Sequence, residues 1–242
     1  SPRQIYTYIE RYFNKRDIVK SKNFKALVTA GPTREYIDPV RYISNESSGK
    51  QGYEIALALS KLGIKTTLVI GPSNLTTQKN IKTKKIVTAD EMFVEVKKSL
   101  PVDVAICTAA VSDFKPLRKN KNKLKKDKTI IKSIPIEKNK DILEYLSKNN
   151  ENRPKLVVGF SAETEGLNKN SLIKLKKKNC DLIIANDVSK KDKGFNSDYN
   201  EVSIIDNNGN IKIIKKNKKS FVAGKIAEII LDKLLIDDRN FN

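Results

Sequence analysis

The chain has 242 residues, a formal net charge of +20 and no histidine. A chain of this length can bury the core of one large α/β domain or of two small domains. The lack of histidine excludes Ser-His-Asp catalysis, Cys-His catalysis and every histidine-ligated metal site. The two cysteines give no disulfide framework and lie in or beside apolar runs, so we expect buried thiols and a reducing, cytoplasmic setting.

The positive charge does not by itself predict a nucleic-acid partner. Forty of the 48 basic residues are lysine, and the chain has no tryptophan. Surfaces that read DNA or RNA rely on arginine and on stacked aromatic rings, so we expect no nucleic-acid partner. Acidic small molecules suit such a field better. No apolar run is long enough to span a membrane and no signal peptide is visible, so we expect no membrane contact.

Apolar runs alternate with amphipathic runs along the chain. The predicted strands lie at about 25–29, 65–70, 84–87, 102–109, 155–160 and 181–185. The predicted helices lie at about 3–14, 50–62, 90–99, 139–148, 170–178 and 218–235. Before the last helix, the runs EVSIID and IKIIKK flank NNGN and predict a β-hairpin. The repeated β-α-β order predicts an α/β, Rossmann-like fold, with a mostly parallel sheet and helices on both faces.

The connection over residues 29–52, TAGPTREYIDPVRYISNESSGKQG, is far longer than the usual 2–6 residues between a strand and a helix. It is not a Walker A loop, because Ser44 replaces the first glycine and Gln51 replaces the final Ser or Thr. A G-x-G-x-x-G fingerprint is also missing, which argues against an NAD-dependent dehydrogenase. The small residues and hydroxyls of SNESSGKQG, followed by a helix N-terminus, indicate an anion site. The glycines could instead serve only to pack the helix on the sheet.

The run LRKNKNKLKKDKT, residues 117–129, is strongly basic and contains a single acidic residue. Composition alone favours a solvated loop over a mobile lid that carries cations to a polyphosphate. Polar residues also follow several predicted strands, including Asp113 and Asn186, where open α/β sheets bind ligands. Lys174 and Lys178 are four residues apart, which places both ammonium groups on one helix face.

Several long motifs occur in a fixed order from about residue 25 to the C-terminal helix. They are TAGPTREYIDPVRYISNESSGKQGYEIA, AAVSDFKP, KLKK, VVGFSAET and DLIIANDVSKKDKGFNSDYNEVSII. Together they resemble the synthetase domain of the phosphopantothenoylcysteine synthetase family. The resemblance implies a connector over residues 1–20 and a synthetase domain over 21–242. In bacteria an FMN-dependent decarboxylase usually precedes this domain, so FMN is expected only there.

The resemblance implies a ligase that joins 4′-phosphopantothenate to L-cysteine with CTP and Mg²⁺. An acyl-cytidylate forms with release of pyrophosphate, and cysteine then displaces CMP. Such chemistry needs placed charge more than an imidazole, because lysines and Mg²⁺ stabilise the leaving pyrophosphate. ATP in place of CTP, or a nucleotide-binding module without ligase activity, remain the alternatives. The family also implies a homodimer whose pantothenate site draws on both subunits, with the C-terminal hairpin near the interface.

The resemblance also assigns roles to individual residues. Lys123, the first lysine of KLKK, matches the catalytic lysine of the family, which makes the basic run a predicted lid over the phosphates. Asn45 matches an asparagine that positions the acyl carbonyl, while Arg41 and Ala110 match residues that assist this step or hold phosphopantothenate. The expected CTP-binding residues are Cys107, Thr108, Ala109, Asp113, Lys123, Lys140, Asp141, Ile142, Leu143, Phe160, Lys174 and Lys178. The family usually has proline at Lys140, and Mg²⁺ is expected to bind through the nucleotide phosphates rather than through side chains.

Overall fold

The computed structural model describes residues 19, 22–125, 133–148, 151–163, 165–187 and 197–237. Its main strands are β1 (Lys25–Ala30), β4 (Lys65–Ile70), β5 (Lys82–Lys85), β6 (Val104–Cys107), β9 (Leu156–Glu163), β10 (Leu182–Asp187), β11 (Tyr199–Asp206) and β12 (Ile211–Lys218). Its helices are α2 (Lys50–Lys61), α3 (Ala89–Ser99), α4 (Ile142–Lys148), α5 (Leu167–Lys178) and α6 (Lys219–Asp237). The predicted elements in these ranges are present, with small shifts at their ends. The helix predicted at 3–14 lies outside the described residues.

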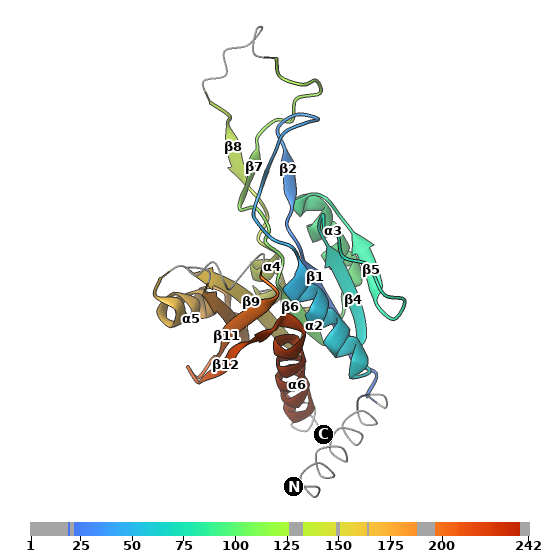
Figure 1. Cartoon of the computed structure of the whole chain (residues 1–242), viewed down its shortest axis with the longest axis vertical. Coiled ribbons are helices and arrows are strands. Elements are labelled where there is room, and N and C mark those ends of the chain that lie inside the picture. The colour runs from blue at the N-terminus through green and yellow to red at the C-terminus, as the bar shows by residue number, and fades with distance from the viewer. Residues whose placement is uncertain are drawn as a thin grey trace, which may run out of the picture.

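The main strands form one eight-stranded sheet in the order β12-β11-β10-β9-β6-β1-β4-β5 (Figure 1). Within this sheet, neighbouring strands pair in parallel along β5, β4, β1, β6, β9 and β10. In contrast, β11 pairs antiparallel with both β10 and β12. The predicted mostly parallel sheet and the predicted C-terminal hairpin are therefore confirmed. Parallel pairing gathers the carboxyl ends of β1, β6, β9 and β10 at one edge of the sheet.

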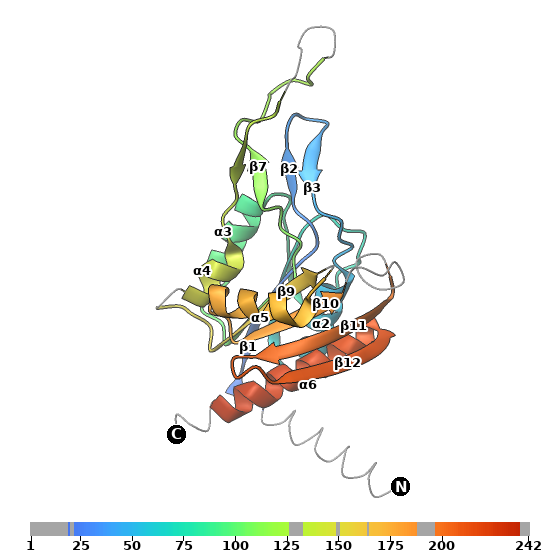
Figure 2. The ribbon, with the colours of Figure 1, turned by 90° about the vertical axis from the view of Figure 1, so that its left-hand side faces the viewer.

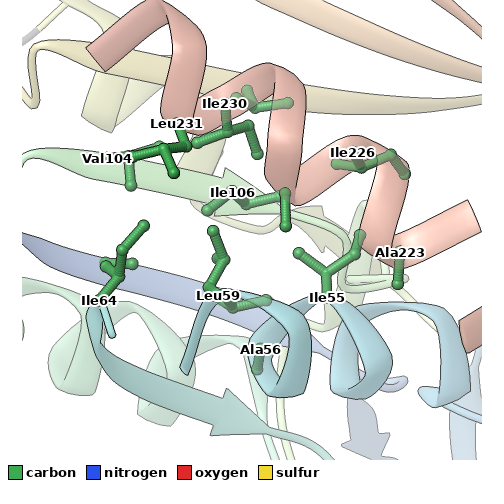
Figure 3. Packing of buried hydrophobic residues seen from close by; sticks show 14 of the residues in the cluster. Ile55, Ala56, Leu59, Ile64, Val104, Ile106, Ala223, Ile226, Ile230 and Leu231 are labelled. Carbon is green, nitrogen blue, oxygen red and sulfur yellow. The ribbon is translucent and has the colours of Figure 1, made fainter. Parts of the chain in front are cut away.

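Helices cover both faces of the sheet, with α2 and α6 on one face and α3, α4 and α5 on the other (Figure 2). Successive strand residues point to opposite faces, so Val28 packs in the first layer and its neighbour Leu27 in the second. In the first layer, Ile55 of α2 and Ile226 of α6 meet over Ile106 of β6 (Figure 3). The predicted coverage of both faces is therefore confirmed.

Four short strands outside the main sheet form a projection that the sequence did not predict. β2 (Arg34–Tyr36) pairs with β3 (Tyr42–Ser44), and β7 (Phe114–Pro116) pairs with β8 (Ile136–Lys138). The two hairpins follow the carboxyl ends of β1 and β6 and extend together from the body (Figures 1 and 2). We call residues 34–44, 114–125 and 133–138 the arm. The connection over 29–52 is therefore not a loop throughout.

The buried carboxylate of Asp38 joins the two halves of the arm. It accepts hydrogen bonds from the backbone N–H groups of Val40 and Arg41 at 2.8 Å and of Leu124 at 3.2 Å. Burial acts to raise the pKa of Asp38, but these bonds and the Arg41 guanidinium at 3.2 Å lower it overall. Residues 117–125 of the basic run are exposed apart from half-buried Leu124, but hydrogen bonds at Asn120 and Leu124 attach the run to residues 37–41. Residues 126–129 lie outside the described residues.

Gly52→Ala should destabilise the fold, because α2 lies very close to the sheet at this residue. A Cβ atom at Gly52 would lie 2.0 Å from Thr108 Oγ1 and 2.7 Å from Ala30 Cβ. Overpacking of this kind costs about 1–3 kcal/mol, against a gain of up to about 1 kcal/mol in helix propensity. Urea unfolding followed by circular dichroism measures the change.

Gly224→Ala in α6 is the matched control, because a Cβ atom there would meet nothing within 4 Å. This control adds only the higher helix propensity of alanine over glycine, so the free energy of unfolding should rise by up to about 1 kcal/mol. Equal stability of the two variants would contradict the close packing of α2 on β1.

Candidate active site

A cavity of about 670 Å³ lies at the carboxyl ends of β1, β6, β9 and β10. Ligands of open α/β sheets bind at this edge, which is where the sequence placed the site. The described residues that line the cavity are 29, 45–52, 107–113, 139–143, 160–162, 174, 178, 186, 200 and 219. The cavity therefore brings together segments that are up to about 190 residues apart in the sequence.

Hydrogen bonds between the ends of β1 and β6 fix one wall of the cavity. Thr108 donates its backbone N–H to the Thr29 carbonyl at 3.1 Å and its hydroxyl to the same oxygen at 2.5 Å. Ala110 donates its N–H to the Gly31 carbonyl at 2.9 Å. Burial raises the pKa of Cys107, the last residue of β6, to about 12, so its thiol is neutral and serves as apolar wall.

The N-terminus of α2 faces the cavity and is suited to an anion. Gly49 occupies the N-cap with φ +73°, and a Cβ atom there would approach the Gly31 backbone to 3.1 Å. The first turn carries no acidic residue, and the Ser47 and Ser48 hydroxyls accept from the N–H groups of Gly49 at 3.3 Å and Lys50 at 3.4 Å. The start of α2 therefore brings its partial positive charge to the cavity wall, and the predicted anion site at SNESSGKQG stays a prediction.

Asn45 lies where the arm meets the cavity. Its Nδ2 donates to the Val111 carbonyl at 3.0 Å, which connects the end of β3 to the segment after β6. Beside it, the Ser44 hydroxyl donates to the Thr33 carbonyl at 2.7 Å. The amide of Asn45 is thus held in one orientation by the chain itself.

The opposite wall carries the two predicted lysines of α5. Lys174 donates to the Phe160 carbonyl at 2.8 Å, and Lys178 donates to Asp141 at 2.7 Å and to Glu144 at 2.9 Å. Burial acts to lower the pKa of Lys178, but the two carboxylates raise it overall. Lys178 is therefore a charged residue that holds residues 141–144 against α5.

Lys140 stands where the family usually has proline, and the structure shows what its side chain contacts. Its ammonium lies 3.5 Å from Asp90 and 5.0 Å from the centre of the Phe93 ring, both in α3. Asp90 also binds Lys115 of the arm at 2.6 Å, and this bond is the main cause that lowers the pKa of Asp90. Lys140 thus attaches the cavity edge to α3, and the residue lines the cavity.

Most predicted site residues lie together on the cavity wall. These are Asn45, Cys107, Thr108, Ala109, Ala110, Asp113, Lys140, Asp141, Ile142, Leu143, Phe160, Lys174 and Lys178. Arg41 and Lys123 do not line the cavity of this chain. Arg41 binds the Leu124 carbonyl at 2.5 Å on the arm, and Lys123 is exposed beside it.

The lining residues that were not among the predicted site residues include Asn139, Asn200 and Lys219. The only signal in the sequence that could have indicated Asn139 is its position directly before the predicted segment 140–143. Lys219 is one lysine in a run of lysines after the hairpin, and nothing in the sequence distinguishes it.

The cavity wall carries five lysines and three carboxylates, which favours a polyanionic ligand. The described residues contain no group of three carboxylates or cysteines placed to hold a metal ion. Across the same residues, no helix is both long and apolar enough to cross a membrane.

Residues 21–234 match the model of the DNA/pantothenate metabolism flavoprotein C-terminal domain. The chain belongs to this family. It is 40% identical over 230 residues to the coenzyme A biosynthesis bifunctional protein CoaBC of Haemophilus influenzae, covering 95% of this chain and 56% of the relative. It is 38% identical over 224 residues to CoaBC of Escherichia coli, covering 90% and 54%. The chain thus spans just over half the length of these relatives.

Solved structures agree with this membership. The crystal structure of the C-terminal domain of CoaBC matches with a TM-score of 0.73 and 33% identity, covering 89% of this chain and 96% of that one. A Cab2 mutant in complex with phosphopantothenate-cysteine has a TM-score of 0.72 at 17% identity, covering 97% and 96%, and it supports the fold alone.

Proposed function

We propose that the chain is the phosphopantothenate–cysteine ligase part of a coenzyme A biosynthesis enzyme and that it uses CTP. The observation that carries the proposal is the gathering of the family's motif residues on one cavity, in a chain 40% identical to CoaBC over 95% of its length. The FMN-dependent decarboxylase that usually precedes the domain would be its working partner, either fused or separate.

The first step would join the pantothenate carboxylate to the α-phosphate of CTP. Residues 107–109, 140–143 and Phe160 enclose one side of the cavity, where Asp113 can accept hydrogen bonds from ribose hydroxyls. The triphosphate would then lie toward the N-terminus of α2. Mg²⁺, which prefers phosphate oxygens and water, would arrive with the triphosphate and stabilise its charge.

The second step would be the attack of the cysteine amine on the acyl-cytidylate. Asn45 would polarise the acyl carbonyl, since its amide is already fixed by the bond to the Val111 carbonyl. CMP then leaves, and its phosphate oxygen carries the charge that the N-terminus of α2 stabilises.

A second copy of the chain would complete the site. Arg41 and Lys123 match functional residues of the family, but both lie on the arm and outside the cavity of their own chain. An arm that extends from the body can reach a neighbouring cavity. We therefore propose a homodimer in which each cavity receives the arm of its partner.

Purified protein with phosphopantothenate, cysteine, CTP and Mg²⁺ should release pyrophosphate and CMP and form the amide. Leaving out any one substrate is the control. Replacement of CTP by ATP should lower kcat/KM strongly, because the larger purine must fit a site shaped by residues 107–109 and 140–143. Background pyrophosphate release with all substrates would favour a nucleotide-binding module, and equal rates with ATP would refute the assignment of CTP.

Lys123→Gln and Asn45→Asp should block different steps. Lys123→Gln removes a cation from the triphosphate, so neither acyl-cytidylate nor pyrophosphate should appear. Asn45→Asp keeps the shape but replaces an amide donor with a negative charge, so the acyl-cytidylate should accumulate while turnover falls about 10²–10³-fold. Mass spectrometry of quenched reactions follows the intermediate. Acyl-cytidylate in Lys123→Gln, together with none in Asn45→Asp, would reverse the two roles.

Mixing the two variants tests whether the arm acts on the partner. A heterodimer of Lys123→Gln and Asn45→Asp combines one intact cavity with the intact arm of the other chain, so ligase activity should return. Unmixed variants, treated in the same way, provide the baseline. If each arm served its own cavity, no mixture would recover activity.

A further inference from the structure

Two lysines line the cavity at the end formed by α2 and α6, and the proposed reaction assigns no role to either side chain. Lys50 is the first residue of α2, and Lys219 is the first residue of α6. Lys219 is only 3% exposed. Lysine is almost never so deeply buried in a folded protein unless its charge is compensated.

Hydrogen bonds from two segments, α2 and the residue before β11, fix the backbone of Lys219. Its N–H donates to the Asp198 carbonyl at 2.9 Å, and its own carbonyl accepts from Gln51 Nε2 at 3.4 Å. The Oε1 atom of Gln51 accepts in turn from Asn200 Nδ2 at 3.1 Å. The first turns of α2 and α6 are therefore attached to each other and to the start of β11, which holds both lysines at one place on the cavity wall.

Charged groups of both signs lie near Lys219 among the described residues. The carboxylate of Asp198 forms an ion pair with Lys50, and Glu46 lies on the cavity wall in the loop before α2. Burial and, to a smaller extent, the charge of Lys50 lower the pKa of Lys219 to about 8, although Asp198 acts to raise it. The neutral form of Lys219 therefore gains population as the pH rises through about 8.

We propose that Lys219 and Lys50 form a subsite for a phosphate group of a substrate. A phosphate dianion carries two negative charges and several acceptor oxygens, which match two ammonium groups beside the N-terminus of α2. The inference rests on the proposed ligase function, which brings two phosphate-bearing molecules to this cavity, CTP and phosphopantothenate. A phosphate of either molecule fits the two ammonium groups, and the experiment below distinguishes which molecule binds there.

Binding at this subsite is coupled to a proton. A bound dianion favours the charged form of Lys219 and raises its pKa toward the ordinary value. Below pH 8 the ammonium is already charged, so the affinity is highest there. Above pH 8 binding must take up a proton, so the affinity falls as the pH rises.

Isothermal titration calorimetry of the whole chain in Mg²⁺ tests the subsite with three ligands: CTP, phosphopantothenate and inorganic pyrophosphate. At pH 7, Lys219→Met should weaken at least one substrate about 10- to 100-fold, as expected for the loss of a hydrogen bond to a charged group. Between pH 7 and pH 9 the wild-type affinity should fall, and Lys219→Met should lose this dependence. Lys215→Met, which removes an exposed lysine of β12, is the matched control and should match the wild type.

The pattern of losses assigns the phosphate. Weakened CTP with unchanged phosphopantothenate places the nucleotide phosphates at the subsite, and the reverse places the phosphate of the pantothenate there. Lys219→Arg keeps its charge at pH 9 and should bind at that pH as tightly as at pH 7. If Lys219→Met does not fold, the subsite is tested by the affinities of Lys219→Arg at pH 7 and pH 9 and by the pH dependence of the wild-type affinity.

Wild-type affinities that do not change between pH 7 and pH 9, or unchanged binding of all three ligands by Lys219→Met, would overturn the subsite. A ligase assay on the same samples separates this inference from the proposed function. Wild-type protein without turnover refutes the function, whereas turnover with unchanged affinities in Lys219→Met refutes only the subsite.

Discussion

Parallel pairing of β1 with β6 is the constraint on which the rest of the site depends. The register that places Thr29 opposite Cys107 ends both strands at the same edge, and Thr108 then bonds back to the Thr29 carbonyl. Two long segments leave this edge together, residues 31–49 after β1 and residues 108–125 after β6. The cavity wall, the N-terminus of α2 and the arm all follow from that one pairing.

In the proposed reaction, placed charge would act instead of a tuned acid–base residue. The chain has no histidine, and the thiol of Cys107 is held neutral by burial. Five lysines and the N-terminus of α2 surround the space instead. A reaction between a carboxylate and a triphosphate is opposed mainly by mutual repulsion, so preorganised positive charge is the form of catalysis that such a site can provide. The depressed pKa of Lys219 shows the cost of collecting that charge away from water.

Periodicity predicted the main sheet well because its strands and helices bury long apolar faces, as Leu27 and Val28 do on opposite sides of β1. It could not predict the arm, since strands of three residues have too little pattern and depend on tertiary bonds such as Leu124 N–H to Asp38. Long family motifs located most of the cavity wall. The motifs did not predict that Lys219, which directly follows the antiparallel hairpin, lines the cavity. They also did not predict that Arg41 binds the Leu124 carbonyl on the arm.

A crystal structure of the chain with CTP and Mg²⁺ is the most direct test of the central claim that this cavity is a nucleotide site built on the carboxyl ends of β1 and β6. We expect cytosine and ribose beside residues 107–109, 140–143 and Phe160, with the triphosphate directed at the N-terminus of α2. A nucleotide bound outside the cavity, or one with its base at α2 and its phosphates against Phe160, would contradict the account.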